Sequence, residues 1–557
     1  MRSLFKFDLS NIRGDIFGGI TAGIVALPLA LAFGVQSGLG AAAGIYGAMA
    51  LGFFAAWLGG TPSQVSGPTG PMTVVSAGVA INVAAAAGGL AEGMGAILLT
   101  FMIAGALQIV MGIAKVGKYI RYVPYPVISG FMTGIGLIII LLQVFPMLGY
   151  KSPAAIIDVF LDIHSPLSAI NYYALLLAGL TYVIIMLFPK ITKKVPSTLI
   201  ALLAVTGLSI AMGWEVPLIG LIPKGLPELH IVGIFNIEAH LWSTIISDAI
   251  ALAMLGAIDS LLTSLIADSM TRTRHNSERE LVGQGIGNMI AAAIGGLPGA
   301  GATMRTVVNI NSGGKTRLSG MVHGLLLLTV LLGLGRFAQY IPLSVLAGIL
   351  ISVGLGIMDI RGIKQLRHVP RSDAFVLVLV LLFTVFFDLI QAVALGLALA
   401  SLLFMKRMGD ESKDRSRLVK LNDFLKTPRF DELEFLELMR DKVIVKDLHG
   451  PIHFGFTSSL QDMASELPKV PYVVIRMKEV PFIDQSGLNT LMELIDDLHA
   501  LGTQVFITEL QHQPARVLSE SRVAPGMVPV ANILSNFAAV LPTLREREAV
   551  RTPITIQ

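Results

Sequence analysis

Two short stretches rich in glycine and proline interrupt hydrophobic segments, one in each half of the chain. They are Gly-Pro-Thr-Gly-Pro at residues 67–71 and Gly-Ala-Gly-Ala-Thr at residues 299–303. Inside a membrane, irregular backbone is tolerated only where it is buried in protein or lines a cavity. Paired interruptions at corresponding positions of two halves indicate the substrate site of a transporter. The sequence therefore predicts a transport protein whose site lies between the two breaks.

The composition is that of a membrane protein. Of the 557 residues, 54% are hydrophobic and only 14% are charged, which is unlike a soluble domain. Apolar runs long enough to span a bilayer as helices recur up to about residue 404. Counting them gives about fourteen spans. We therefore expect an all-α polytopic membrane domain over residues 1–407.

Basic residues in the loops between the apolar runs predict the orientation. In an even-span arrangement 18 lysines and arginines fall on one side, and only Lys151, Lys224 and Arg336 fall on the other. Because basic loops stay in the cytoplasm, both termini are predicted to be cytoplasmic, in a bacterial inner membrane. The 18 residues are Arg2, Lys6, Arg13, Lys115, Lys118, Arg121, Lys190, Lys193, Lys194, Arg272, Arg274, Arg279, Lys315, Arg317, Arg361, Lys364, Arg367 and Arg371.

The chain changes character near Met405, where charged residues become frequent. Residues 408–438 are predicted to form a polar linker. In residues 439–550, β-type runs at 443–445, 472–477 and 504–508 alternate with an amphipathic helix at 487–500. We expect a small cytosolic α/β domain here.

The two breaks also suggest the chemistry of the site. A helix that starts inside the protein directs its free N–H groups and the positive end of its dipole at whatever lies before it. Two such starts, one near Pro68 and one near Gly301, would form a compact anion site, to which Thr69 and Thr303 add hydroxyl donors. The alternative is that these glycines and prolines serve only helix packing, as they often do in membranes.

Asp259 is the second candidate for a functional role. It lies in the middle of a predicted span, where an ionised carboxylate costs at least about 2.5 kcal/mol. Thr263 follows one helical turn later on the same face. Carboxylate, hydroxyl and the free carbonyls of the second break are oxygen ligands that a hard cation prefers, so sodium beside the anion is predicted. A protonated aspartate within the core and a proton-coupling aspartate are the alternatives.

The chain resembles the SulP sulfate-permease family along nearly its whole length. The resemblance is carried by residues 18–33, 66–75 and 123–133, and above all by 276–288. The segment Val-Pro-Phe-Ile-Asp-Gln-Ser-Gly-Leu at 480–488 is similar to a STAS domain, and this domain order is specific to the family. The resemblance implies two inverted seven-span repeats arranged as core and gate domains, alternating access and a homodimer.

Motifs at 258–264 and 299–304 are similar to those of the family's sodium-dependent bicarbonate branch. This likeness implies sodium ligands at Asp259, Thr263, Gly301 and Thr303. It implies an anion-facing set of Phe33, Thr69, Gly70, Ala302 and Thr303, with Phe33 as an apolar wall.

Arg305 leaves the substrate open. Sulfate and dicarboxylate relatives commonly carry arginine at this position, and an arginine near the helix start would favour a doubly charged anion. It could instead face outward and anchor a lipid. Sodium-coupled bicarbonate symport is thus the leading prediction, and proton-coupled sulfate or C4-dicarboxylate transport, or anion exchange, is the alternative.

Other functional classes receive less support. No nucleotide-hydrolysis, metalloprotease or serine-hydrolase motif is present, so an enzyme is not predicted. A nucleobase permease and a non-transporting sensor were the remaining hypotheses, and nucleic acid is not expected as a partner. Ser486 is a candidate regulatory phosphorylation site of the STAS domain, which could also bind a cytosolic partner. Its simpler interpretation is a helix N-cap.

Overall fold

The computed structural model describes residues 10–120, 123–153, 156–192, 195–219, 227, 229, 237–387, 389–420, 439, 441–456 and 469–551. The chain divides into two compact units, Met1–Leu397 and Ala398–Gln557, and each is described by itself. Arg2, Lys6, Arg121, Lys193, Lys194 and Lys224, which entered the prediction of orientation, lie outside the described residues.

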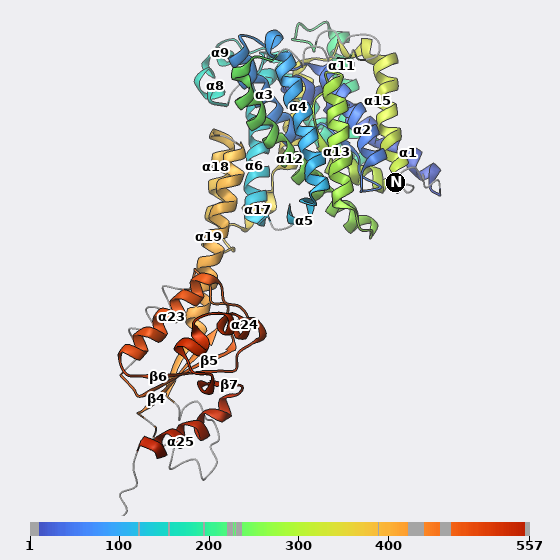
Figure 1. Cartoon of the computed structure of the whole chain (residues 1–557). Helices are drawn as coiled ribbons and strands as arrows, with labels where there is room; N and C mark the ends of the chain where they lie inside the picture. Colours follow the sequence, from blue (N-terminus) through green and yellow to red (C-terminus); the bar gives the residue numbers. More distant parts are fainter. Residues whose placement is uncertain are drawn as a thin grey trace, which may run out of the picture. The chain divides into compact units, whose positions relative to one another are not determined.

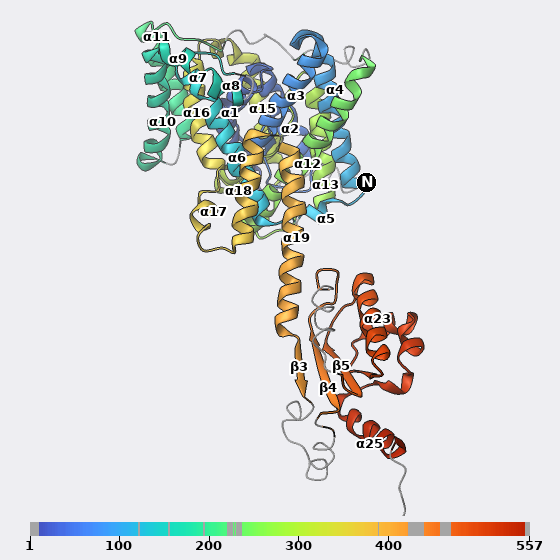
Figure 2. The same cartoon turned by 90° about the vertical axis from the view of Figure 1, so that its left-hand side faces the viewer.

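The first unit is a bundle of apolar helices (Figures 1 and 2). Eight helices of the described chain are long and apolar enough to cross a membrane, and shorter apolar helices accompany them. The count of fourteen spans stays a prediction. The helices are α1 (Ile12–Gln36), α2 (Ala41–Leu58), α3 (Gly70–Ala87), α4 (Leu90–Ile113), α5 (Gly117–Ile120), α6 (Tyr125–Leu142), α7 (Val144–Met147), α8 (Ile156–Leu161), α9 (His164–Ser168), α10 (Tyr172–Ile191), α11 (Ser197–Met212), η2 (Ala239–Leu241), α12 (Trp242–Thr271), α13 (Ser277–Ala293), α14 (Thr303–Asn311), α15 (Arg317–Ala338), α16 (Leu343–Ile357), α17 (Ile360–Gln365), α18 (Arg371–Phe386) and α19 (Leu389–Arg415).

Basic segments gather at one end of this bundle. The start of α1, the short helix α5 and the short helix α17 lie at the same end, whereas α8 and α9 lie at the opposite end (Figures 1 and 2). Lys118 of α5 and Arg361 of α17 belong to the set predicted to be cytoplasmic. The arrangement fits an even number of spans between these segments. The location of the termini stays a prediction.

The second unit contains a five-stranded sheet in the order β3-β4-β5-β6-β7. β3 is antiparallel to β4, and the other neighbours are parallel. Both faces are covered, because alternate side chains of β4 and β5 pack on α23 and α24 on one side and on α25 on the other. The elements are β3 (Arg417–Lys420), β4 (Val443–His449), β5 (Tyr472–Glu479), α23 (Gln485–Ala500), β6 (Gln504–Thr508), α24 (His512–Glu520), η3 (Val523–Met527), η4 (Val530–Asn532), β7 (Ile533–Leu534), η5 (Phe537–Ala539) and α25 (Val540–Arg551).

The predicted elements of this unit are present with slightly different bounds, and the expected apolar face of α23 is buried through Leu491, Leu494, Ile495 and Leu498. In the predicted linker 408–438, residues up to Arg415 continue α19 and 417–420 form β3. Residues 421–438 lie outside the described part.

Ser486 is not the N-cap of its helix, and that interpretation was wrong. α23 begins at Gln485, and Asp484 is its N-cap, whose Oδ1 accepts a 2.7 Å hydrogen bond from the Gly487 amide. Ser486 is exposed in the first turn, where its backbone oxygen accepts from the Thr490 hydroxyl. A carboxylate two residues earlier in the sequence is as good a cap as serine, so the N-cap is set by where the helix begins.

Glu280 of α13 organises the backbone that leads into the first break. Its Oε2 accepts hydrogen bonds from the Gly60 and Thr61 amides, both at 2.8 Å. Its Oε1 accepts from the side-chain amides of Gln64 and Gln284, at 2.7 and 2.8 Å. Only 1% of the residue is exposed. The carboxylate therefore satisfies backbone donors that would otherwise be buried without a partner.

We expect Glu280→Ala to lower the free energy of unfolding by about 3 kcal/mol or more, because two buried backbone donors and two side-chain amides lose their acceptor. Thermal unfolding of the purified protein in detergent measures this change. Glu278→Ala, two residues earlier in α13, is the matched control and should leave the unfolding temperature nearly unchanged. Equal effects of the two variants would contradict this role of Glu280.

Candidate functional site

The two breaks meet in space and pair with each other. Ser66–Gly67 forms strand β1 and Ala300–Gly301 forms strand β2, and they are antiparallel, with Ser66 opposite Gly301 and Gly67 opposite Ala300. A Cβ atom at Gly299 would lie 2.1 Å from the Gly67 carbonyl oxygen. Glycine is therefore required at this crossing, because any side chain would push the two backbones apart.

Each break leads directly into a helix. α3 begins at Gly70 with Thr69 as N-cap, and α14 begins at Thr303. The first-turn N–H groups of a helix have no partner within it. The start of α3 is buried, and α14 begins at the half-buried Thr303, directly after the buried Ala302. The predicted pair of internal helix starts is therefore present in the structure.

Thr69 connects the start of α3 to α12. Its Oγ1 donates a 2.7 Å hydrogen bond to Oδ2 of Asp259. The same oxygen accepts from the Met72 amide as the N-cap of α3. Asp259 is 8% exposed in the middle of α12, and Thr69 is equally buried. Thr69 is therefore both the N-cap of α3 and the residue that holds the Asp259 carboxylate at the start of that helix.

Thr263 connects the start of α14 to the next turn of α12. Its Oγ1 lies 2.9 Å from the Gly301 carbonyl oxygen, to which it donates, and 2.7 Å from Oγ1 of Thr303. Asp259 and Thr263 are four residues apart, which corresponds to about 6 Å along a helix. The two helix starts therefore bind adjacent turns of the same face of α12.

Arg305 points into this cluster from the first turn of α14. It is 2% exposed, and its Nη2 donates to the Pro68 carbonyl oxygen of the opposite break. Its Nη1 is buried and has no hydrogen-bond partner among the residues that the structure describes. Asp259 is close enough for the opposite charges to attract. The alternative in which Arg305 faces outward to a lipid is wrong, because Met304 takes the exposed position with 68% of its surface accessible.

Arg305 also fills the space beside Gly67. A Cβ at Gly67 would lie 2.5 Å from Nη1 of Arg305. Because Gly67 has no side chain, there is room for the Arg305 guanidinium beside the first break. The glycine at 67 and the arginine at 305 therefore depend on each other.

The remaining predicted residues lie around this cluster. Ala302 is the N-cap of α14, and its amide donates a 2.8 Å bond to the Val65 carbonyl. A Cβ at Gly70 would meet the side chains of Ile357 in α16 and Ile139 in α6 at 2.5 and 2.8 Å. Phe33 is buried in α1 with 3% exposure. Its place as an anion-facing wall, like the functional roles of the other residues, stays a prediction.

Several polar residues that support the breaks were missed at the sequence level. Asn288 of α13 makes two hydrogen bonds with Gly299, from its amide to the carbonyl at 3.1 Å and from the backbone N–H to its oxygen at 2.8 Å. Ser260 Oγ accepts from the Gly301 amide at 3.1 Å. Gln64 lies against Gly301. A polar residue inside an apolar helix was the available signal, since its burial requires a partner.

Glu280 does not form a capping box with Ser277, although the three-residue spacing in the sequence would allow one. Asn276 caps α13, where its side-chain oxygen accepts a 2.9 Å hydrogen bond from the Arg279 amide. The Glu280 side chain turns away from its own helix start and binds the segment before β1 instead. The unsatisfied amides of a distant loop are stronger competitors for this carboxylate than the local cap.

Comparison with known proteins agrees with this architecture. The model of the "Sulfate permease family" matches residues 12–380, and that of the "STAS domain" matches residues 439–535. The chain belongs to the sulfate permease family. It is a multi-pass membrane protein of a transporter family and, as predicted, not an enzyme.

Individual relatives cover nearly the whole chain. The "Bicarbonate transporter BicA" of Picosynechococcus is 40% identical over 543 residues, which are 96% of this chain and 95% of that protein. The protein of the same name from Synechocystis is 40% identical over 541 residues, again 96% and 95%. A solved transmembrane domain of a cyanobacterium bicarbonate transporter BicA is 43% identical and covers 71% of this chain and 98% of that one, with a TM-score of 0.64.

We expect Gly299→Ala to abolish the function of the site, because the new methyl group would overlap backbone atoms of Gly67 that cannot rotate away. The measurement is the unfolding temperature together with solute uptake in cells. Gly78→Ala in α3 is the control, since a Cβ there meets nothing within 4 Å. It should be neutral or stabilise by up to about 1 kcal/mol. Full activity of the Gly299 variant would contradict the crossing.

Proposed function

We propose that the chain is a secondary transporter that moves a small anion together with sodium, with bicarbonate as the leading substrate. The single observation that carries the proposal is that hydrogen bonds join both internal helix starts to Asp259 and Thr263, on adjacent turns of α12. Partial positive charge at the helix starts and negative charge on Asp259 are then neighbours. Such a site suits an anion and a cation that stabilise each other.

The oxygen atoms around Thr263 have the chemistry of a sodium site. The Thr263 and Thr303 hydroxyls, the Gly301 carbonyl and the Asp259 carboxylate all offer hard oxygen ligands. The Thr263 hydroxyl lies 2.9 Å from the Gly301 carbonyl oxygen and 2.7 Å from the Thr303 hydroxyl. A hydroxyl has one proton, so these contacts leave lone pairs on both threonines free to face a cation. Among the described residues, no group of three or more His, Cys, Asp or Glu side chains could hold a metal ion instead.

Charge balance favours coupling of the two ions. Asp259 and Arg305 are both buried and carry opposite charges, so their formal charges cancel. An anion that bound to this neutral cluster would lose its hydration without a compensating charge. With sodium present the cluster has one net positive charge, which matches a monovalent anion such as bicarbonate. Sodium binding should therefore precede or accompany tight anion binding.

Sulfate or a C4-dicarboxylate is the second candidate, and one observation favours it. Nη1 of Arg305 is buried in the cluster, where no described residue is its hydrogen-bond partner, and guanidinium groups bind doubly charged oxyanions well. In that case the arginine would supply the charge that sodium supplies in the leading proposal. The predicted homodimer, the regulatory role of Ser486 and a cytosolic partner of the STAS domain stay predictions.

The sodium proposal is tested by uptake of labelled bicarbonate into proteoliposomes with and without an inward sodium gradient. Wild-type uptake should require the gradient. Thr263→Val removes a hydroxyl ligand with little change in shape and should raise the sodium concentration for half-maximal uptake by about tenfold, the effect of losing about 1.4 kcal/mol. Asp259→Asn should abolish the sodium dependence.

The control for these variants is Thr329→Val, whose hydroxyl bonds only the Leu325 carbonyl within its own helix. It should behave as wild type. Uptake that is driven by external acid and indifferent to sodium would overturn sodium coupling and would support the second candidate.

Arg305 distinguishes the two substrates. In the leading proposal Arg305→Gln leaves the cluster neutral when sodium is bound, so the KM for bicarbonate should rise by about tenfold or more. Unlabelled sulfate should compete only weakly with labelled bicarbonate, both in the wild type and in Arg305→Gln. Strong competition by sulfate in the wild type that is lost in the variant would identify a divalent substrate.

A further inference from the structure

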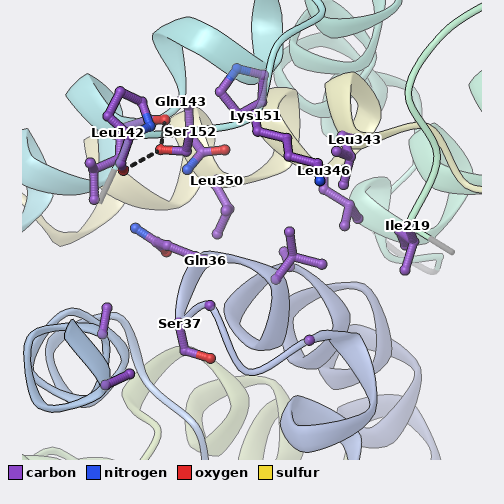
Figure 3. A pocket seen from close by; sticks show the side chains of 18 of the residues that line it. Gln36, Ser37, Leu142, Gln143, Lys151, Ser152, Ile219, Leu343, Leu346 and Leu350 are labelled. Atoms are coloured by element: carbon purple, nitrogen blue, oxygen red, sulfur yellow. Dashed lines mark hydrogen bonds between the residues drawn. The ribbon is translucent and has the colours of Figure 1, made fainter. Parts of the chain in front are cut away.

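A separate cavity of about 540 Å³ lies between two groups of helices in the first unit. One wall is formed by the last turns of α1 and by α3, and the other by α6, α7 and α16, with the loop that contains Lys151 across one side (Figure 3). That loop precedes α8, at the end of the bundle opposite to α5 and α17 (Figure 1). By the predicted orientation this is the outer side of the membrane.

The cavity is distinct from the helix-start site. Ala77 is the lining residue of α3 closest in sequence to Gly70, and seven residues of helix correspond to about 10 Å. At Gly70 itself, the side chains of Ile139 and Ile357 come from the opposite wall and cover the helix start. An anion in the cavity would therefore be separated from α14 and α12 by apolar side chains.

Among the described residues that line the cavity, one is charged, and it is a cation. Lys151 is the only ionisable side chain of this described lining, which otherwise is apolar or uncharged polar. Ser152 Oγ donates a 2.8 Å hydrogen bond to the Leu142 carbonyl and so fixes the neighbouring loop residue to the end of α6. The ammonium group thus belongs to a held segment of the wall (Figure 3).

Gln36 adds an independent sign of a missing ligand. It is the last residue of α1 and extends into the space opposite Gln143 and Ser152 (Figure 3). Both its amide nitrogen and its amide oxygen are buried and have no hydrogen-bond partner among the described residues. Buried amides without a partner cost free energy, so a polar occupant of the cavity, with water, is expected to satisfy this one.

We propose that this cavity is an outer anion site, in which a hydrated monovalent anion is held by the Lys151 charge and the Gln36 amide before it reaches the helix starts. A single positive charge between low-dielectric walls focuses the field and raises the local concentration of anions. The volume is far larger than a small anion, so the ion keeps part of its water. The identity of this anion as the transported one rests on the proposed function.

Because the chain contains no cysteine, single cysteines can report on the cavity without a background reaction. Gln36→Cys and Ala84→Cys each place a thiol on its lining. We expect a negatively charged methanethiosulfonate reagent added outside cells to react about tenfold faster than a positively charged one. Lys151→Gln should remove this preference, and Lys151→Arg should retain it. External bicarbonate should slow the anionic reagent in the Ala84→Cys protein.

Leu167→Cys in α9, exposed at the same end but outside the cavity, is the matched control and should show no dependence on residue 151. Equal rates for the two reagents in the cavity, or a preference unaffected by Lys151→Gln, would overturn the outer anion site. If the anionic reagent reacts faster in the cavity but the wild type takes up no anion, the proposed function is overturned and the outer anion site is still supported. Since labelling does not require transport, the two failures are distinguishable.

Discussion

The structure depends on the requirement that backbone interrupted inside a membrane must still have every polar group satisfied. The chain meets this requirement by crossing its two interruptions as β1 and β2, with Gly299 directly against Gly67. Asn288 and Glu280, both from α13, satisfy the amides on either side of the crossing. The helix starts are thereby held close together, with Thr69 at one and Thr303 at the other, which is the basis of the proposed anion site.

A second consequence of the crossing is electrostatic. It brings Arg305 from one half against the Pro68 carbonyl of the other half, and it places Thr69 on Asp259. Two buried charges of opposite sign are therefore held within one hydrogen-bonded cluster, although burying each alone would be costly. In the proposed function, this neutrality favours an anion that binds together with a cation over a lone anion. Under that proposal, the coupling of two substrates is a consequence of the packing of the two halves.

Much of this site could be predicted from the sequence, because glycine and proline in an apolar segment and an aspartate in mid-span are local signals. Thr69, Asp259, Thr263 and Thr303 are indeed brought together. The partners of Glu280 could not be predicted, since they lie more than two hundred residues away and depend on how the halves pack. For the same reason the direction of Arg305 was undecided until its neighbours in the other break were known. The fold of the second unit could be predicted from the alternation of strands with an amphipathic helix. The N-cap of α23, in contrast, is Asp484, two residues before the expected Ser486.

The proposed function requires that the anion and sodium bind in one cluster and stabilise each other. Thermal unfolding of the purified protein in four buffers, with and without sodium and with and without bicarbonate, tests it most directly, because ligand binding raises stability by mass action. The two ions together should raise the unfolding temperature by more than the sum of their separate effects, and Thr263→Val should remove the excess. Strictly additive shifts would contradict it, since coupled sites must affect each other reciprocally.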